Sequence, residues 1–177
     1  MKTLPDYLCS GLRLVFIGIN PGARSAATGH HYAGPGNHFW PLLHESGLVS
    51  ERLTYEQDAR VLAWGIGLTN MVQRASPSAA ELSRTELRDG AAALRKRLTR
   101  HQPRVACFNG KRIYEVFAGH RCDFGEQDER LGATAVYVMP QTSARTAAYQ
   151  RVDKLRFFLD LKTVVEREER RRRAHEP

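Results

Sequence analysis

The chain has 177 residues, enough for one compact domain spanning residues 1–177 with a sizeable core. Its 42% hydrophobic and 26% charged residues exclude a disordered or fibrous protein, and the formal net charge of +8 favours partners that carry phosphates. No apolar run approaches the roughly 20 residues of a membrane span, and the first residues lack the pattern of a secretory signal. We therefore expect a cytoplasmic protein without membrane contact.

The positive charge belongs mainly to the body of the chain. Residues 166–177 contain five Arg and four Glu, a net of +1, which leaves +7 of the +8 for the rest. We expect residues 166–177 to form a basic helix end or a flexible tail. The three cysteines, Cys9, Cys107 and Cys122, stand far apart. They exclude a four-thiolate metal site within this chain, and we expect reduced thiols and no metal.

Short apolar runs alternate with helical patterns along the chain. Runs at residues 14–17, 105–108 and 135–139, and a weaker one at 67–71, have the composition of strands buried in a parallel sheet. Four stretches carry apolar residues at helical spacing: residues 39–46, 84–100, 111–118 and 154–168. Residues 119–134 are polar and predict an irregular connection. The alternation predicts an α/β fold, a single-domain three-layer α/β/α structure with a central mainly parallel sheet.

The loop after the first predicted strand carries the most unusual composition. Ligands of open α/β sheets bind beyond the carboxyl ends of the strands. Residues 18–36 contain five glycines, which predict a rigid loop that displays its polar and aromatic residues. Neither the dinucleotide-binding nor the P-loop glycine pattern can be read there, so a nucleoside triphosphatase is not expected.

Several motifs recur at ordered positions: GINPG at 18–22, GNHFW at 36–40, GIGLTNMV at 65–72, QPR at 102–104, FNGK at 108–111 and MPQTSAR at 139–145. Together they resemble the mismatch-specific uracil/thymine-DNA glycosylase family over nearly the whole chain. The resemblance implies a fold like that of uracil-DNA glycosylase. It also implies a monofunctional repair enzyme that acts as a monomer on double-stranded DNA containing G·U or related mismatches, without metal or organic cofactor.

Such an enzyme flips the damaged nucleotide out of the duplex and hydrolyses the bond between base and sugar. Asn20 matches the family's catalytic asparagine. A neutral amide is no strong base, but it can accept a hydrogen bond from water and hold that water for attack. Two other interpretations stay open: a non-catalytic module that binds mismatched or bent DNA, and a small-molecule nucleoside hydrolase. The second explains neither the charge nor the loop at 139–145.

The resemblance also assigns a base pocket and a DNA-binding loop. Tyr32 matches the aromatic residue that stacks on the flipped base, and the pocket comprises Gly18, Ile19, Ser25, His31, Tyr32 and Asn70. Arg145 matches the residue that fills the gap left by the flipped nucleotide, because its planar guanidinium can stack between bases while charged. The expected DNA contacts are Gln141, Thr142, Ser143, Ala144, Arg145 and Lys111.

Two positions depart from the family's patterns, Gln141 from the family as a whole and Ser25 from its thymine-processing branch. Gln141 stands where serine or asparagine is usual. Ser25 stands where that branch has alanine, and a bulkier side chain near the 5-position of the base leaves less room for a methyl group. We therefore expect uracil to be processed better than thymine. No carboxylate lies in the first motif, and Asp89, directly before Gly90, is the candidate for a second catalytic group.

Overall fold

The computed structural model describes residues 3–145 and 148–174 and is built around one sheet. Its strands are β1 (Leu14–Gly18), β2 (Ile66–Asn70), β3 (Val105–Asn109), β4 (Gly125–Glu126) and β5 (Ala135–Met139). They lie in the order β2-β1-β3-β5-β4. β1, β2, β3 and β5 run parallel, and the two-residue β4 pairs with β5 in the antiparallel direction. The carboxyl ends of the four parallel strands therefore share one edge of the sheet.

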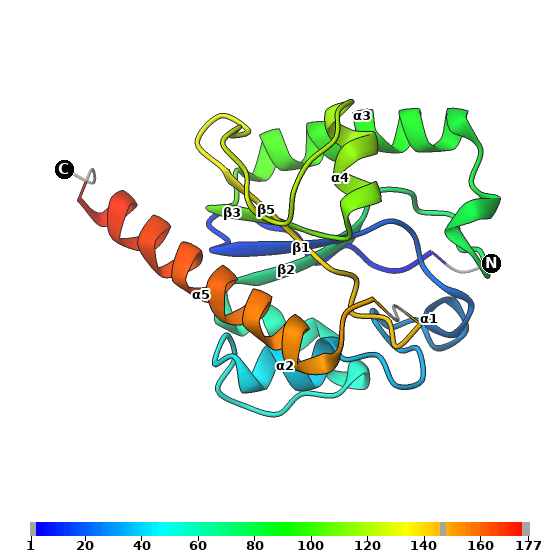
Figure 1. Ribbon diagram of the computed structural model, residues 1–177, viewed down its shortest axis with the longest axis horizontal. Coiled ribbons are helices and arrows are strands. Elements are labelled where there is room, and N and C mark those ends of the chain that lie inside the picture. Colours follow the sequence, from blue (N-terminus) through cyan, green and yellow to red (C-terminus); the bar gives the residue numbers. More distant parts are fainter. Residues whose placement is uncertain (1–2, 146–147, 175–177) are drawn as a thin grey trace.

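Helices cover both faces of this sheet, as Figure 1 shows. The α-helices are α1 (Ala23–Thr28), α2 (Phe39–Glu45), α3 (Arg84–His101), α4 (Lys111–Ala118) and α5 (Arg151–Arg173). Two 3-10 helices are η1 (Tyr55–Trp64) and η2 (Ala79–Glu81). α3 and α4 lie on one face, while α2, α5 and η1 lie on the other. The three-layer α/β/α prediction is confirmed.

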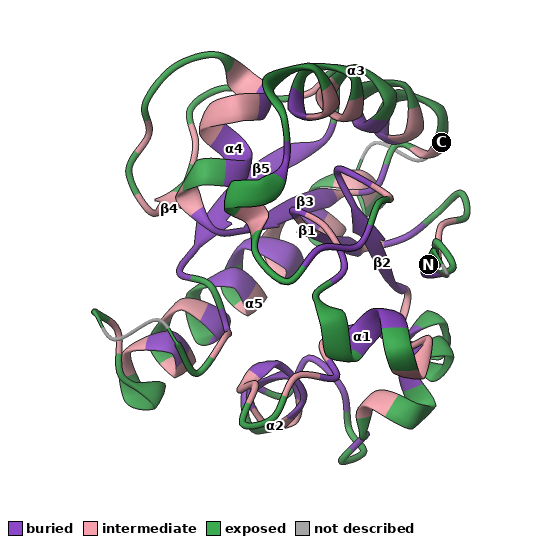
Figure 2. Ribbon diagram, turned by 90° about the vertical axis from the view of Figure 1, so that its right-hand side faces the viewer, coloured by how far each residue is buried: buried purple, intermediate pink, exposed green. Residues whose placement is uncertain are grey.

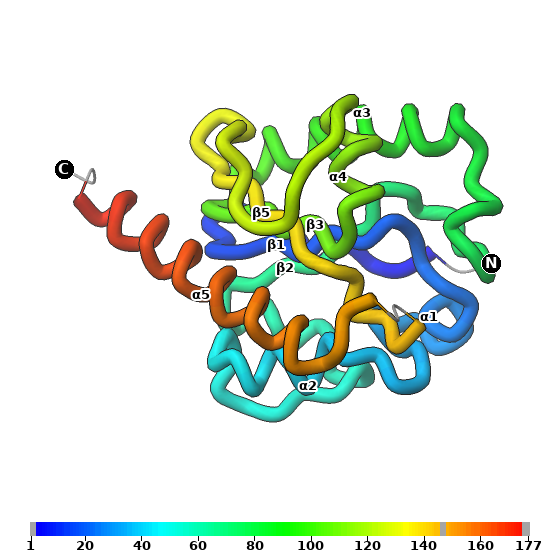
Figure 3. The backbone as a smooth tube through the Cα atoms, in the orientation of Figure 1, coloured from blue at the N-terminus to red at the C-terminus, as the bar shows by residue number. Residues whose placement is uncertain are grey.

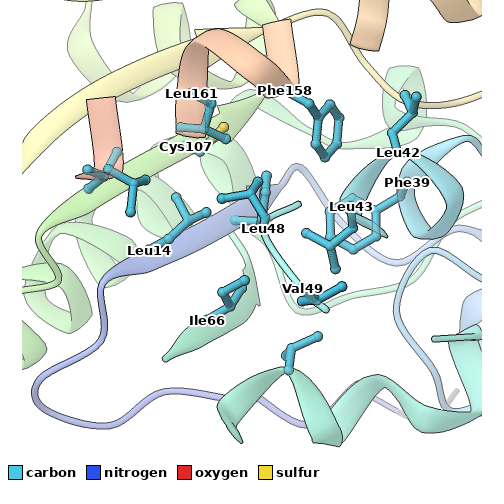
Figure 4. Packing of buried hydrophobic residues seen from close by; sticks show 14 of the residues in the cluster. Leu14, Phe39, Leu42, Leu43, Leu48, Val49, Ile66, Cys107, Phe158 and Leu161 are labelled. Atoms are coloured by element: carbon cyan, nitrogen blue, oxygen red, sulfur yellow. The ribbon is translucent and has the colours of Figure 1, made fainter. Parts of the chain in front are cut away.

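Alternate residues of each strand supply two separate apolar cores. Phe16 packs with α2 and α5 on one face, whereas Val15 packs with α3 and α4 on the other. Figure 4 shows the first core, with Phe39 of α2 and Phe158 of α5 gathered near Leu14. Burying an aromatic or aliphatic side chain of this kind contributes about 1.5–3 kcal/mol. The strands are accordingly the most buried part of the molecule, as the purple sheet in Figure 2 shows.

The strand predictions agree with the structure to within one residue, and four elements were not predicted. α1 occupies what was expected to be loop, η1 and η2 lie where no element was expected, and β4 interrupts the connection expected to be irregular. α5 begins three residues earlier than predicted and continues to Arg173, so residues 166–173 are a helix end and not a flexible tail. Residues 175–177 of that predicted segment lie outside the described residues. None of the described helices is both long and apolar enough to cross a bilayer.

The segment before β1 covers the outer edge of β2. Tyr7 N donates to Leu68 O at 2.9 Å, and Leu68 N donates to Tyr7 O at 3.1 Å. These bonds satisfy backbone groups that an edge strand would otherwise expose. The same segment reaches the carboxyl edge of the sheet through Pro5, which contacts the loop after α1, and Asp6, which accepts a hydrogen bond from Thr69 of β2.

Gly90 of α3 marks a close contact between this helix and the chain after β2. A Cβ at Gly90 would lie 2.8 Å from both the carbonyl oxygen of Met71 and Cγ2 of Val72. Glycine to alanine within a helix normally stabilises a protein by about 1 kcal/mol. Gly90→Ala is expected to destabilise instead, by about 1–3 kcal/mol, because α3 must move away from Met71.

Urea unfolding of wild-type and Gly90→Ala proteins measures this difference. Ala93→Gly, at an exposed position of the same helix, is the control and should lose about 1 kcal/mol through helix propensity alone. A Gly90→Ala protein more stable than the wild type would contradict the close packing.

Candidate functional site

The carboxyl edge of the sheet brings Gly18 of β1 beside Asn70 of β2, its partner in the strand register. A Cβ at Gly18 would lie 2.5 Å from Oδ1 of Asn70 and 3.8 Å from the hydroxyl oxygen of Tyr32. Glycine is therefore needed at position 18, because any side chain there would overlap the Asn70 amide, which packs directly against the backbone of β1. Three residues predicted for the base pocket are thus brought together by the fold.

The loop after β1 is held by backbone hydrogen bonds to the segment after β2. Met71 N donates to Gly18 O at 2.8 Å, and Val72 N donates to Ile19 O at 2.8 Å. Ser76 N then donates to Pro21 O at 3.1 Å. These bonds extend the parallel pairing of β1 and β2 beyond the sheet, so the loop that carries Asn20 has a fixed backbone.

The Asn20 side chain is fixed by the same segment. Its Nδ2 donates to the carbonyl oxygen of Arg74 at 3.0 Å and to Oγ of Ser76 at 2.7 Å. Ser76 is buried, and its own hydroxyl donates to Ser78 O at 2.7 Å. Because both amide hydrogens have acceptors, the amide orientation is set and Oδ1 is left as a hydrogen-bond acceptor. Sequence reasoning did not single out Ser76.

Tyr32 adopts an unusual backbone conformation for a residue with a side chain. Its φ of 54° lies in the left-handed region, which costs roughly 1–3 kcal/mol outside glycine. Its ring stacks on Phe39, with centroids 3.9 Å apart and planes at 19°. Burial raises the pKa of the Tyr32 hydroxyl, which keeps that group protonated. Phe39 supports one face of the ring, which suits Tyr32 to the predicted stacking role.

His31, directly before Tyr32, is held at three points. Its backbone N donates to Oδ2 of Asp58 at 2.8 Å, and its carbonyl oxygen accepts from Nε1 of Trp40 at 3.2 Å. Its ring Nε2 donates to the carbonyl oxygen of Pro5 at 2.8 Å. Burial lowers the pKa of the His31 imidazole, so the ring is neutral near pH 7. His31 is therefore a fixed part of the loop that carries Tyr32.

Asp58 of η1 is the acceptor at the centre of this arrangement, and its side chain is 1% exposed. Besides His31 N, it accepts from the Tyr7 hydroxyl at 3.0 Å and lies 3.1 Å from Nδ1 of His30. Burial, and after it the Asp58 charge, raise the pKa of Tyr7 to about 12, so Tyr7 remains a donor. The backbone departs from helical geometry at Gln57, directly before Asp58. Sequence reasoning missed Asp58, because nothing in the local pattern marks it.

Ser25 of α1 belongs to the same loop cluster. It is buried, and its Oγ accepts a hydrogen bond from Ala33 N at 3.2 Å. The hydroxyl therefore ties α1 to the residue that follows Tyr32. This places Ser25 beside the predicted pocket, and its effect on the choice of base stays a prediction.

The predicted DNA-binding loop follows β5 and passes beside α2, as the yellow to orange tube of Figure 3 shows. Thr142 and Asn109 exchange two hydrogen bonds of 3.1 Å, from Asn109 Nδ2 to Thr142 Oγ1 and from Thr142 N to Asn109 Oδ1. Thr142 is 1% exposed. Its side chain therefore shapes the loop and does not face a ligand, which differs from the predicted phosphate contact.

The remaining residues of this loop are more accessible. Gln141, Ala144 and Arg145 are exposed, and the Oγ of Ser143 accepts from Arg145 N at 3.3 Å. Within residues 3–145 and 148–174, the Arg145 guanidinium has no hydrogen bond or ion pair. Its charge is available to a ligand that approaches this edge.

Two predicted residues lie away from this cluster. Lys111 Nζ is 3.8 Å from Oδ1 of Asp123 and 4.5 Å from the ring centroid of Phe124, in an open hollow of about 750 Å³ whose lining includes no residue of the first loop. Asp89 has a side chain that is 63% exposed and accepts from Nε of Arg88 at 3.1 Å. The structure does not bring Asp89 to Asn20, and its catalytic role stays a prediction. Among the described residues, no three His, Cys, Asp or Glu side chains gather to hold a metal ion.

The fold and these loops define a three-layer α/β protein with a cluster of polar and aromatic loop residues at the carboxyl edge of its parallel strands. The model of the uracil DNA glycosylase superfamily matches residues 5–162, and the chain belongs to that superfamily. Over 160 residues it is 36% identical to a G/U mismatch-specific uracil DNA glycosylase of Schizosaccharomyces pombe (strain 972 / ATCC 24843), covering 84% of this chain and 49% of the relative. The chain thus spans about half the length of that relative. The resemblance found in the motifs is confirmed.

Replacing Asp58 tests whether this carboxylate holds the site together. In Asp58→Asn, one carboxylate oxygen becomes an NH₂ group that cannot accept a hydrogen bond. The free energy of unfolding is expected to fall by about 1.5–3 kcal/mol, the range for hydrogen bonds to a charged group.

Urea unfolding monitored by circular dichroism measures the change. Asp123→Asn, at a fully exposed carboxylate, is the matched control and should stay within about 0.5 kcal/mol of the wild type. Equal stability of the Asp58→Asn and wild-type proteins would show that the donors around Asp58 do not depend on its charge.

Proposed function

We propose that this protein excises uracil that is mispaired in double-stranded DNA, by hydrolysing the bond between the base and its sugar. The observation that carries the proposal is the Asn20 amide. Both of its hydrogens are taken by Arg74 O and Ser76 Oγ, and its Oδ1 stays free as an acceptor. An acceptor fixed in this way can hold one water molecule in line with the sugar carbon under attack.

The base lies, in this proposal, between Gly18, Asn70 and the ring of Tyr32. Asn70 and the Tyr32 hydroxyl both lie close to the backbone at Gly18, and the Tyr32 ring would stack on the face of a flat pyrimidine held there. Base stacking on an aromatic ring contributes about 1–3 kcal/mol and depends little on base identity. Selectivity then comes from hydrogen bonds with the base edge, for which the Asn70 amide and the first-loop backbone provide donors and acceptors.

Bond cleavage leaves a negative charge on the departing base and a positive charge on the sugar. Fixed N–H groups around the pocket stabilise the negative charge on the base, and the positioned water attacks the positively charged sugar. No group at Asn20 acts as a strong base, since an amide stays neutral near pH 7. Slow turnover is therefore expected, because the rate depends on positioning and on stabilisation of the leaving group.

The DNA partner is supported by charge and by the loop after β5. The net charge of +8 favours a polyanion, and the Arg145 side chain lies on the exposed part of that loop. Arg145 fills the space of the flipped nucleotide in this proposal. The name of the Schizosaccharomyces pombe relative, which specifies a G/U mismatch, supports uracil opposite guanine as the substrate. Action as a monomer stays a prediction.

A panel of oligonucleotides tests the reaction, the base and the strandedness together. We expect excess protein to produce abasic sites fastest in G·U duplexes, more slowly in G·T duplexes because of Ser25, and more slowly in single strands. Alkaline cleavage at abasic sites gives the rates. Equal rates for G·U and G·T would contradict the Ser25 effect, and no abasic sites in any duplex would contradict the proposed function.

Asn20→Ala separates catalysis from binding within the same experiment. The rate is expected to fall by about a hundredfold or more, because the water loses its holder, while affinity for a G·U duplex stays close to wild type. Gln127→Ala is the control, since that amide also donates two hydrogen bonds, in its case to the carbonyl oxygens of Asp123 and Gly125, but lies far along the chain. Unchanged cleavage by Asn20→Ala would refute the role of Asn20. Binding without cleavage by the wild-type protein would favour a non-catalytic mismatch-binding module.

A further inference from the structure

Among the residues that the structure describes, Lys154 is a buried cation without an anionic partner. It lies in the first turn of α5, and it is 1% exposed. Its Nζ donates to the carbonyl oxygen of Ser143 at 2.9 Å and lies 3.3 Å from Nδ1 of His38. Across residues 3–145 and 148–174, no carboxylate lies within 4.0 Å of Nζ.

This placement is unfavourable for the isolated protein. Burial lowers the pKa of the Lys154 ammonium, which means that the surroundings disfavour its charge. The first turn of a helix also carries the positive end of the helix dipole, where anions and not cations are stabilised. Residues that conflict with local physical rules in this way tend to mark functional sites. The missing partner of Lys154 is an anion.

His38 connects this buried charge to the surface. An ammonium group has donors only, so Nδ1 of His38 must accept from Lys154, and the ring hydrogen is then on Nε2. Burial, and next the Lys154 charge, lower the pKa of His38, which keeps the ring neutral. Nε2 of His38 has no hydrogen-bond partner among the described residues, and it is accessible to solvent. His38 therefore presents an unused donor outward.

The position of His38 is beside the loop that carries Arg145. His38 N donates to Thr142 O at 3.0 Å, and a Cβ at Gly36 would lie 3.4 Å from Cβ of Ala144. A duplex seated on this loop brings its phosphates close to both segments. Ser143, whose carbonyl oxygen Lys154 holds, is part of the same surface.

We propose that Nε2 of His38 donates a hydrogen bond to a backbone phosphate of the bound DNA, with the Lys154 ammonium behind it as the charge that the phosphate neutralises. The inference rests on the proposed function in one respect, the seating of duplex DNA on the loop after β5. Lys154 also positions that loop through Ser143 O. Neither residue touches the base or the water held by Asn20.

His38→Asn removes the outward donor while keeping the inward acceptor, because the amide oxygen of asparagine takes the place of Nδ1. Affinity for an undamaged duplex, measured by fluorescence anisotropy, is expected to fall about tenfold, the effect of one hydrogen bond to a charged group. The single-turnover rate at saturating G·U duplex should stay within about twofold, since the catalytic residues are unchanged. His120→Asn, which removes an exposed histidine elsewhere, is the control and should bind like the wild type.

Lys154→Met distinguishes a phosphate anchor from a purely structural clamp. Removing an unpaired buried cation should leave the melting temperature equal or higher, while duplex affinity falls about as much as in His38→Asn. Lys162→Met removes one charge from the same helix at a position paired with Glu166, and it should change affinity much less. A lower melting temperature with unchanged affinity would mean that Lys154 only stabilises the fold and would overturn the proposal.

His38→Asn decides the question if Lys154→Met does not fold, and wild-type affinity in His38→Asn overturns the phosphate contact. Binding to undamaged DNA is scored independently of base release. A wild-type protein that binds through His38 but releases no uracil keeps this inference and refutes the proposed function. If the wild-type protein releases uracil while His38→Asn binds duplex DNA normally, the proposed function stands and this inference is refuted.

Discussion

A single buried carboxylate, Asp58, determines the shape of the site. A charge removed from water is tolerated only when hydrogen bonds replace its hydration. Asp58 obtains them from the Tyr7 hydroxyl, from His30 and from the backbone of His31, which belong to two segments far from η1 in the sequence. Those segments must therefore meet at one place if the carboxylate is to be satisfied. The N-terminal segment and the loop after α1 are fixed relative to each other by this requirement.

The hydrogen bonds that fix His31 also restrict the backbone of the next residue, Tyr32. With its N–H, carbonyl and ring all bonded, His31 leaves little freedom to the next residue, and Tyr32 is held in a left-handed conformation. That conformation places the Tyr32 ring on Phe39 and its hydroxyl near Gly18. The Asn20 side chain is fixed separately, by its hydrogen bonds to the carbonyl oxygen of Arg74 and to Oγ of Ser76. The chemistry then depends on neutral groups held in position, and positioning alone can supply a large part of a rate enhancement.

The sequence predicted the parts of the molecule that follow a period or a motif. Buried strands gave continuous apolar runs, and the loops at their carboxyl ends carried the motif residues. Asp58 was missed because it lies in a 3-10 helix that is kinked at Gln57 and was not predicted from the sequence. Lys154 could have been found, since it shares the helical spacing of the buried Phe158, Leu161 and Val165. A lysine at the helical spacing of buried apolar residues indicates a buried charge, and only the spacing of the residues shows it.

The hydrogen bonds around Asp58 and the first loop would assemble the pocket proposed for the base before DNA binds. Hydrogen exchange of backbone amides in the DNA-free protein tests this claim most directly, because the His31 amide donates to Asp58 and the Met71 and Val72 amides donate to the first loop. These three amides should exchange about as slowly as those of the central strands β1 and β3. Fast exchange in the free protein, with protection gained only on addition of duplex DNA, would contradict the claim and show that DNA builds the pocket.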